Sequence, residues 1–131
     1  MLAISSYPRD YVDSTRAGID ARVAAFRKLG DTGEFETVFF NDLVLVLEFA
    51  FVHRVRNAEG KDGNALNEVR LLATSLLGNG GRLVADKQIK LKPETSILGY
   101  AAGDEIAVRE DSFARLADAF FAAIAERYPA P

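Results

Sequence analysis

The residues best suited to chemistry gather in one polar segment, His53 to Arg70, which lies between two apolar stretches. Its sequence, HRVRNAEGKDGNALNEVR, holds one histidine, three arginines, one lysine, three acids and three asparagines. Guanidinium, amide and carboxylate groups can recognise a polar or anionic ligand through hydrogen bonds. The segment therefore predicts a non-catalytic binding site for such a small molecule or for a protein partner. The candidate ligand-binding residues are His53, Arg54, Arg56, Lys61, Asp62, Asn64, Asn67, Glu68 and Arg70.

His53 is the only histidine of the chain, and its imidazole could act as a general base or as a metal ligand. One histidine cannot supply the usual two- or three-histidine metal site, and no HExxH spacing is present. A structural or capping role is the other interpretation of His53. A small hydrolase or nuclease that uses His53 with Glu48 or Glu68, with or without a divalent ion, is the alternative to a binding domain.

The loop EGKDGN has the composition of anion- or metal-binding turns but departs from each known template. Lys61 is not followed by the Ser or Thr of a phosphate-binding loop, GxGxxG is missing, and the acids lack EF-hand spacing. Spacing gives no support to a cation held by Glu59, Asp62, Asn64 and Glu68, so we predict neither a metal nor a cofactor. Turn formation and helix capping explain the same residues equally well.

Glu48 is the acid that we expect to be buried, because it interrupts the apolar run from Leu43 to Val52. An isolated buried charge costs several kcal/mol, so this carboxylate needs a partner. Arg70 or a cation of a ligand could provide it. A buried Glu48–arginine pair that fixes the register of two helices is the alternative to a catalytic acid.

A second basic stretch, ADKQIKLKPE, contributes Lys87, Lys90 and Lys92. These lysines could face an anion beside Arg54 and Arg56. Alternatively, they only keep a surface segment soluble.

Four segments with helical spacing must position these residues, and the predicted helices cover residues 8–29, 34–57, 64–77 and 110–128. The second is apolar on nearly every side, which is typical of a helix at the centre of a bundle. Asn64 is the expected N-cap of the third helix. If the second and third helices are antiparallel across a short turn, the polar segment converges at one end of the bundle.

Pro93, Gly99 and Gly103 punctuate the stretch 82–109, which predicts an irregular connection or a short β-hairpin. The fold class that follows is mainly α: one four-helix bundle-like domain over residues 1–131, with an irregular or short β-hairpin insert before the last helix.

Composition narrows the function classes. The chain has 131 residues, of which 49% are hydrophobic and 27% charged, as in ordinary single domains. Cysteine is absent and no secretory signal is recognisable, which favours the cytoplasm. The strongest apolar run is about half the length that spans a bilayer, so we expect no membrane insertion. A net charge of −3 argues against nucleic acid as a partner.

Apolar surface for a homodimer could come from the phenylalanines of the second helix and from Phe120 and Phe121. A possible homo-oligomer is therefore among the expected assemblies. In that case the polar segment could be an interhelical network or a dimer seam.

Three stretches, FNDLVLVLEFAFVHRVRNAEGKDGNALNEVR, ADKQIKLKPETSILGY and GDEI, resemble a group of small uncharacterised bacterial proteins. The resemblance extends from residue 40 to the C-terminus and implies a shared small helical domain, without an activity, cofactor or catalytic residue. Minimal helical nucleases of the HEPN type place a histidine several residues after an arginine. Here Arg54 and Arg56 follow His53, so the order is reversed.

Overall fold

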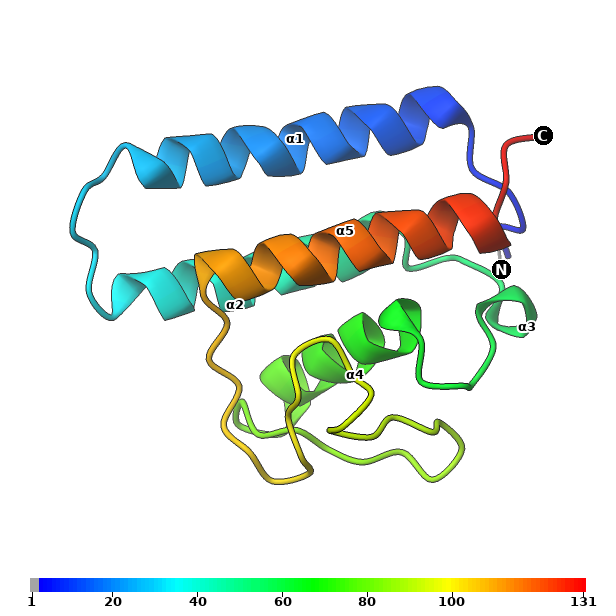
Figure 1. Ribbon diagram of the computed structural model, residues 1–131. Coiled ribbons are helices and arrows are strands. Elements are labelled where there is room, and N and C mark those ends of the chain that lie inside the picture. Colours follow the sequence, from blue (N-terminus) through cyan, green and yellow to red (C-terminus); the bar gives the residue numbers. More distant parts are fainter. Residues whose placement is uncertain (1–2) are drawn as a thin grey trace.

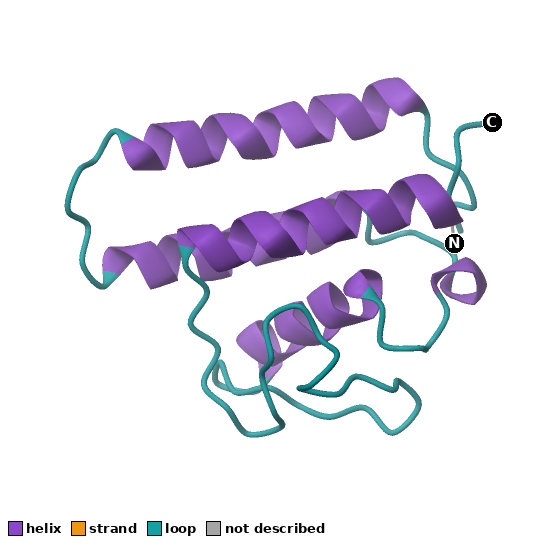
Figure 2. Ribbon diagram, viewed as in Figure 1, coloured by secondary structure: helices purple, strands orange, loops and turns teal. Residues whose placement is uncertain are grey.

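The computed structural model describes residues 3–131, and its regular secondary structure is helical (Figure 1, Figure 2). Within that range the chain forms α1 (Arg9–Arg27), α2 (Phe35–Ala50), α3 (Arg56–Glu59), α4 (Ala65–Gly78) and α5 (Glu110–Arg127). The described residues form no sheet and contain only two isolated bridges, a parallel one between Ile4 and Arg54 and an antiparallel one between Arg82 and Glu105. None of the helices in this range is long and apolar enough to cross a membrane.

The four long helices are arranged in layers, with α1 on one side of α2 and α5, and α4 on the other (Figure 1). On α5 the apolar residues recur every three or four positions, so they form one stripe that faces the interior. Aromatic side chains fill the centre, where Phe40, Phe51, Phe113 and Phe120 are fully or almost fully buried. Phe121 is also buried, so the Phe120–Phe121 pair belongs to the core and offers no surface for a homodimer.

The stretch 82–109 does not form a β-hairpin, and that part of the predicted fold was wrong. Only Arg82 and Glu105 pair across it. Between them, Pro93 has no N–H to donate, and Gly99 and Gly103 have positive φ angles of 77° and 90° that turn the chain. A few backbone hydrogen bonds surround this bridge, among them those from the Leu83 amide to the Asp104 carbonyl and from the Gly103 amide to the Leu83 carbonyl. The side chains of Ile89 and Ile106 are buried in the helical core and hold the segment as well.

The second helix ends at Ala50, earlier than the predicted Asn57. Phe51 leaves the helical region with φ −126° and ψ 26°, and a turn follows before the short α3 begins. The N-terminal segment satisfies the freed backbone groups: the Ile4 amide donates to the His53 carbonyl, and the Val55 amide donates to the Ile4 carbonyl. This break lets Arg54 point into the protein.

α2 is not enclosed on all sides, in contrast to the position expected for a helix that is apolar all round. Phe35, Val38, Val46 and Phe49 are exposed on its outer face, while Phe40, Leu43, Val44 and Leu47 are buried. The predicted N-cap of the next helix is confirmed, since Asn64 Oδ1 accepts hydrogen bonds from the amides of Leu66 and Asn67.

Candidate functional site

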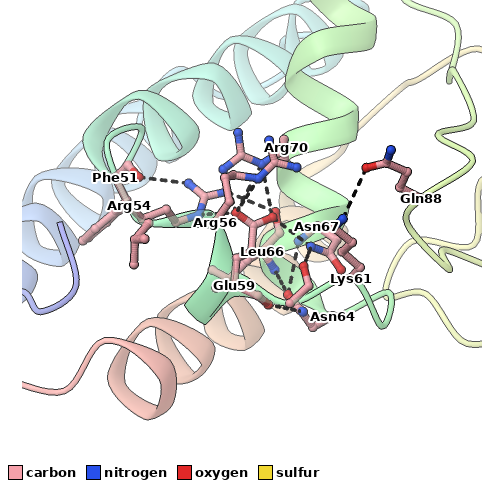
Figure 3. A network of polar contacts seen from close by, with 12 residues as sticks. Phe51, Arg54, Arg56, Glu59, Lys61, Asn64, Leu66, Asn67, Arg70 and Gln88 are labelled. Atoms are coloured by element: carbon pink, nitrogen blue, oxygen red, sulfur yellow. Dashed lines mark hydrogen bonds and ion pairs between the residues drawn. The ribbon is translucent and has the colours of Figure 1, made fainter. Parts of the chain in front are cut away.

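A buried ion-pair network connects the end of α2, α3 and the first turns of α4 (Figure 3). We call it the arginine–glutamate network; its members are Glu48, Arg54, Glu59, Asn67 and Arg70.

Arg54 is the fully buried cation of the network. Its Nε lies 3.0 Å from Glu59 Oε1 and its Nη2 lies 2.9 Å from Glu48 Oε1. Its Nη1 donates to the Phe51 carbonyl at 3.0 Å, and Nη2 also donates to the Leu66 carbonyl at 3.2 Å. The turn after α2 therefore inserts a charged side chain into the core together with partners for its donors.

Glu59 is the fully buried anion of the network. Besides Arg54, it accepts a hydrogen bond from Arg70 Nη2 at 2.6 Å and one from Asn67 Nδ2 at 2.8 Å. Burial by itself would raise the pKa of Glu59, but the hydrogen bond from Arg70 and the charge of Arg54 outweigh burial and lower it. The Glu59 carboxylate is therefore held in its charged form.

Glu48 is 9% exposed and borders the network on the α2 side. Its main partner is Arg54, and Arg70 Nη1 lies farther away, 3.8 Å from Glu48 Oε2. Burial raises the pKa of Glu48, and the neighbouring arginines offset this only in part. In residues 3–131 no buried side-chain nitrogen or oxygen lacks a hydrogen-bond partner, so the network is closed.

Asn64 and Asn67 hold the loop between α3 and α4. Asn67 Oδ1 accepts from the Gly63 amide at 3.0 Å, and its Nδ2 also donates to the Gly60 carbonyl at 3.0 Å. Asn64 Nδ2 donates to the Glu59 carbonyl at 2.8 Å. Both asparagines therefore act on the protein itself, as a cap and as a loop brace.

His53 lies apart from the acids with which a catalytic role would pair it. Its side chain is exposed and, within the described chain, makes no ion pair, whereas Glu48 is engaged by Arg54. Lys61 and Asp62 are exposed as well and contact Gln88 and Arg127 at 3.3 Å each. The structure does not assemble these side chains into one centre.

The acids of the polar segment do not form a cation site. No group of three or more His, Cys, Asp or Glu residues among the described ones could hold a metal ion. Glu59 faces arginines, and Glu68 accepts hydrogen bonds from the backbone amides of Ile97 at 2.7 Å and Leu98 at 2.9 Å. Glu68 therefore anchors the segment 82–109 to α4.

Replacing Glu68 by glutamine is expected to lower the free energy of unfolding by about 1–3 kcal/mol, because an amide has one acceptor oxygen for the two partly buried N–H donors of Ile97 and Leu98. Burial raises the pKa of Glu68 above its usual value of 4.5. As the pH falls, the Glu68 carboxylate therefore becomes protonated in the folded protein before it does in the unfolded chain. The stabilisation due to that proton is fully present below pH 4.5 and is lost as pH rises through the folded pKa. Urea unfolding should therefore show a larger deficit for the variant at pH 4.5 than at pH 7; a deficit that shrinks on acidification would contradict this.

One groove beside the network is lined by three cationic side chains. It has a volume of about 460 Å³ and lies between α3, α4 and residues 84–87. We call it the basic groove; it is lined by Arg56, Arg70, Leu71, Thr74, Val84, Ala85, Asp86 and Lys87.

The cations of the basic groove differ in how they are held. Arg70 is 18% exposed and is fixed from behind by Glu59, whereas Arg56 is 55% exposed and lies 3.9 Å from the same carboxylate. Lys87 is exposed and makes no ion pair with any described residue. The sequence singles out these three cations but not Thr74, because no pattern in it shows that residues 74 and 87 lie beside the same groove.

A larger groove of about 920 Å³ lies at the other end of the bundle, between the α1–α2 loop and residues 105–110. Its two arginines are already paired, Arg27 with Glu110 and Arg109 with Glu36. The arginines of the basic groove are paired as well, but that groove also contains Lys87, which makes no ion pair with any described residue.

Comparison with known proteins adds no relationship, because no protein family, no curated protein and no solved structure matches the chain.

Proposed function

We propose that the domain binds a small molecule that carries a phosphate or carboxylate group, and that the basic groove is its site. The observation that carries the proposal is the convergence of Arg56, Arg70 and Lys87 on one concave surface of a chain whose net charge is −3. Three cations face one acid there, Asp86, whose Oδ1 accepts a hydrogen bond from the Gln88 amide within its own turn.

The arginine–glutamate network supports this proposal because it orients one of the three cations of the basic groove. Glu59 holds Arg70 through Nε and Nη2, so the guanidinium is oriented before a ligand arrives. An oriented group loses less conformational entropy on binding than a free side chain does. The Thr74 hydroxyl offers a neutral donor, and Leu71 and Val84 offer apolar contact for the rest of the ligand. A hydrolase or nuclease centred on His53 has no comparable observation in its favour.

Titration with inorganic phosphate, pyrophosphate, citrate and ATP, followed by thermal unfolding, tests the proposal. A ligand at 100 times its Kd should raise the free energy of unfolding by about 2.7 kcal/mol. We expect Arg56→Gln and Lys87→Gln each to weaken binding by about tenfold, since charged hydrogen bonds contribute about 1.5–3 kcal/mol. Both side chains are exposed, so the fold should persist.

Lys28→Gln is the matched control, because Lys28 is an exposed lysine at the end of α1 and outside the groove. It should leave the affinity unchanged. The proposal fails if none of the four anions raises the unfolding temperature, or if Lys28→Gln weakens binding as much as Lys87→Gln does.

We also propose that the protein is located in the cytoplasm, because its sequence contains no cysteine.

A further inference from the structure

The lysines of the chain are concentrated in two short segments that pack against each other. Four of the five lysines lie in the loop between α3 and α4 or in the stretch 82–109, namely Lys61, Lys87, Lys90 and Lys92. All four are exposed, and none makes an ion pair with any residue from 3 to 131. The Lys90 amide donates a hydrogen bond to the Lys61 carbonyl at 2.9 Å, so the backbone itself holds the two segments together.

A tight turn brings Lys87 close to Lys61. The Ile89 amide donates to the Asp86 carbonyl at 3.2 Å, which makes Lys87 and Gln88 the two central residues of a β-turn. Lys87 lines the basic groove, and Gln88 Oε1 accepts a hydrogen bond from Lys61 Nζ at 3.3 Å (Figure 3). The tip of this turn therefore contributes both to the basic groove and to a contact with the Lys61 ammonium group.

The Lys61–Gln88 pair keeps its positive charge. An amide oxygen is neutral, so Gln88 orients the Lys61 ammonium group without cancelling its charge. An ammonium group has three N–H donors, and the amide nitrogen of a glutamine adds two more. Lysine is also a common ligand of phosphate groups, which it binds as a point charge. The pair thus has the composition of an anion subsite next to the basic groove.

The acids closest to these lysines along the chain are bound by other groups. Asp62 lies 3.3 Å from Arg127 Nη2, and Asp86 Oδ1 accepts a hydrogen bond from an amide of its own turn. Within residues 3–131 neither acid makes an ion pair with Lys61 or Lys87. Both ammonium groups are therefore without a carboxylate partner in the described chain.

We propose that the Lys61–Gln88 pair is a second anion subsite beside the basic groove, and that the ligand carries a chain of two or more phosphate groups. This assignment rests on the proposed function, because it names the ligand class for the same site. One phosphate group occupies the basic groove, where Arg56, Arg70 and Lys87 supply donors, and a following one reaches the pair. Ionised phosphates present acceptor oxygens along the whole chain, so they match a row of N–H donors. A single phosphate or carboxylate occupies the groove alone.

Calorimetric titration of the whole chain with phosphate, pyrophosphate and tripolyphosphate tests the second subsite. The ionic strength is held constant, because salt screens exposed charges. We expect tripolyphosphate to bind at least about tenfold more tightly than phosphate, which is the effect of one added charged hydrogen bond. Lys61→Gln should remove this gain, while phosphate binding stays within about twofold of the wild type. The Lys61 side chain is exposed, so the fold should persist.

Three further variants separate a local contact from a change in net charge. Lys28→Gln removes the same charge at the end of α1 and should leave the gain unchanged. Lys61→Arg keeps the charge and should keep the gain. Gln88→Glu still offers an acceptor to the Lys61 ammonium group but neutralises it, so this variant should lose the gain as Lys61→Gln does. Equal effects of Lys28→Gln and Lys61→Gln overturn the second subsite.

The outcomes distinguish the second subsite from the proposed function itself. If phosphate binds in a manner that depends on Lys87 but tripolyphosphate binds no more tightly, the second subsite is wrong and the basic groove stands. The same holds if Lys61→Gln weakens phosphate as much as tripolyphosphate, because a single site then uses all the cations. If none of the phosphate compounds binds, both proposals fail. A gain that occurs with ATP but not with tripolyphosphate overturns the second subsite too, because the nucleoside is then the recognised part.

Discussion

Replacing Glu59 by glutamine is expected to lower the free energy of unfolding by about 3–5 kcal/mol, as is typical when one partner of a buried ion pair is removed. The variant leaves Arg54 buried and opposite a neutral amide, and it takes from Arg70 the carboxylate that orients it. Urea unfolding at pH 7 measures the loss. Asp62→Asn removes an exposed acid from the following loop and should cost no more than about 1 kcal/mol.

Two further measurements separate the network from the loss of a single contact. Arg54→Met alone should be destabilising, but in the Glu59→Gln background it should cost much less, because the two residues are in direct contact. Strictly additive losses would contradict a coupled network.

Because the arginines hold the pKa of Glu59 below 4.5, the contribution of the Glu59 carboxylate to stability is present above that pH and is lost as pH falls below it. The stability gap between the wild type and Glu59→Gln should therefore close in acid.

Gly63→Ala is the second substitution with a large expected effect, a loss of about 3 kcal/mol or more. Gly63 has φ +87°, which an alanine adopts at a cost of about 1 kcal/mol. A Cβ at this position would also lie 2.4 Å from the Lys90 carbonyl oxygen, which is backbone and cannot rotate away. The substitution must therefore push the segment 82–109 away from the α3–α4 loop, where the Lys90 amide donates to the Lys61 carbonyl at 2.9 Å.

Gly103→Ala is the matched control for Gly63→Ala. Gly103 has a similar φ of +90°, but no heavy atom lies within 4 Å of the position that its Cβ would take. The Gly103→Ala variant should lose only about 1 kcal/mol of the free energy of unfolding, the cost of placing an alanine at a positive φ. Thermal unfolding of both variants measures the difference, and hydrogen exchange of the Lys90 amide reports on the contact itself. Equal losses in the two variants would show that the approach of Lys90 to Gly63 does not constrain the fold.

Helical periodicity was sufficient to locate the long helices. The stripe of Phe113, Leu116, Phe120 and Ile124 predicts α5, and the side chain of Asn64 marks the start of α4 because it can take up free amide groups. The end of α2 could not be predicted in this way. An apolar run contains no signal for the point at which a distant segment, here Ile4, takes over the backbone hydrogen bonds.

The composition of the polar segment indicates a polar cluster but not which of its residues face a ligand. Arg54 and Arg56 are separated by one residue, yet one is enclosed by carboxylates and the other borders the basic groove. The short helix α3, of four residues, separates the directions of these two side chains. A helix of one turn is too short to show helical periodicity in the sequence. The hairpin prediction failed because strand pairing in residues 82–109 is limited to the bridge between Arg82 and Glu105, while buried side chains and Glu68 hold the rest of the segment.

The members of the arginine–glutamate network also lie close together along the chain. Its hydrogen bonds connect Arg54 to positions five and six residues away, and they connect Glu59 to positions eight and eleven residues away. Short loops close at a low entropic cost and on a fast timescale. The break after α2, the single turn of α3 and the start of α4 can thus assemble early in folding, before α5 arrives from the far end of the sequence to cover them.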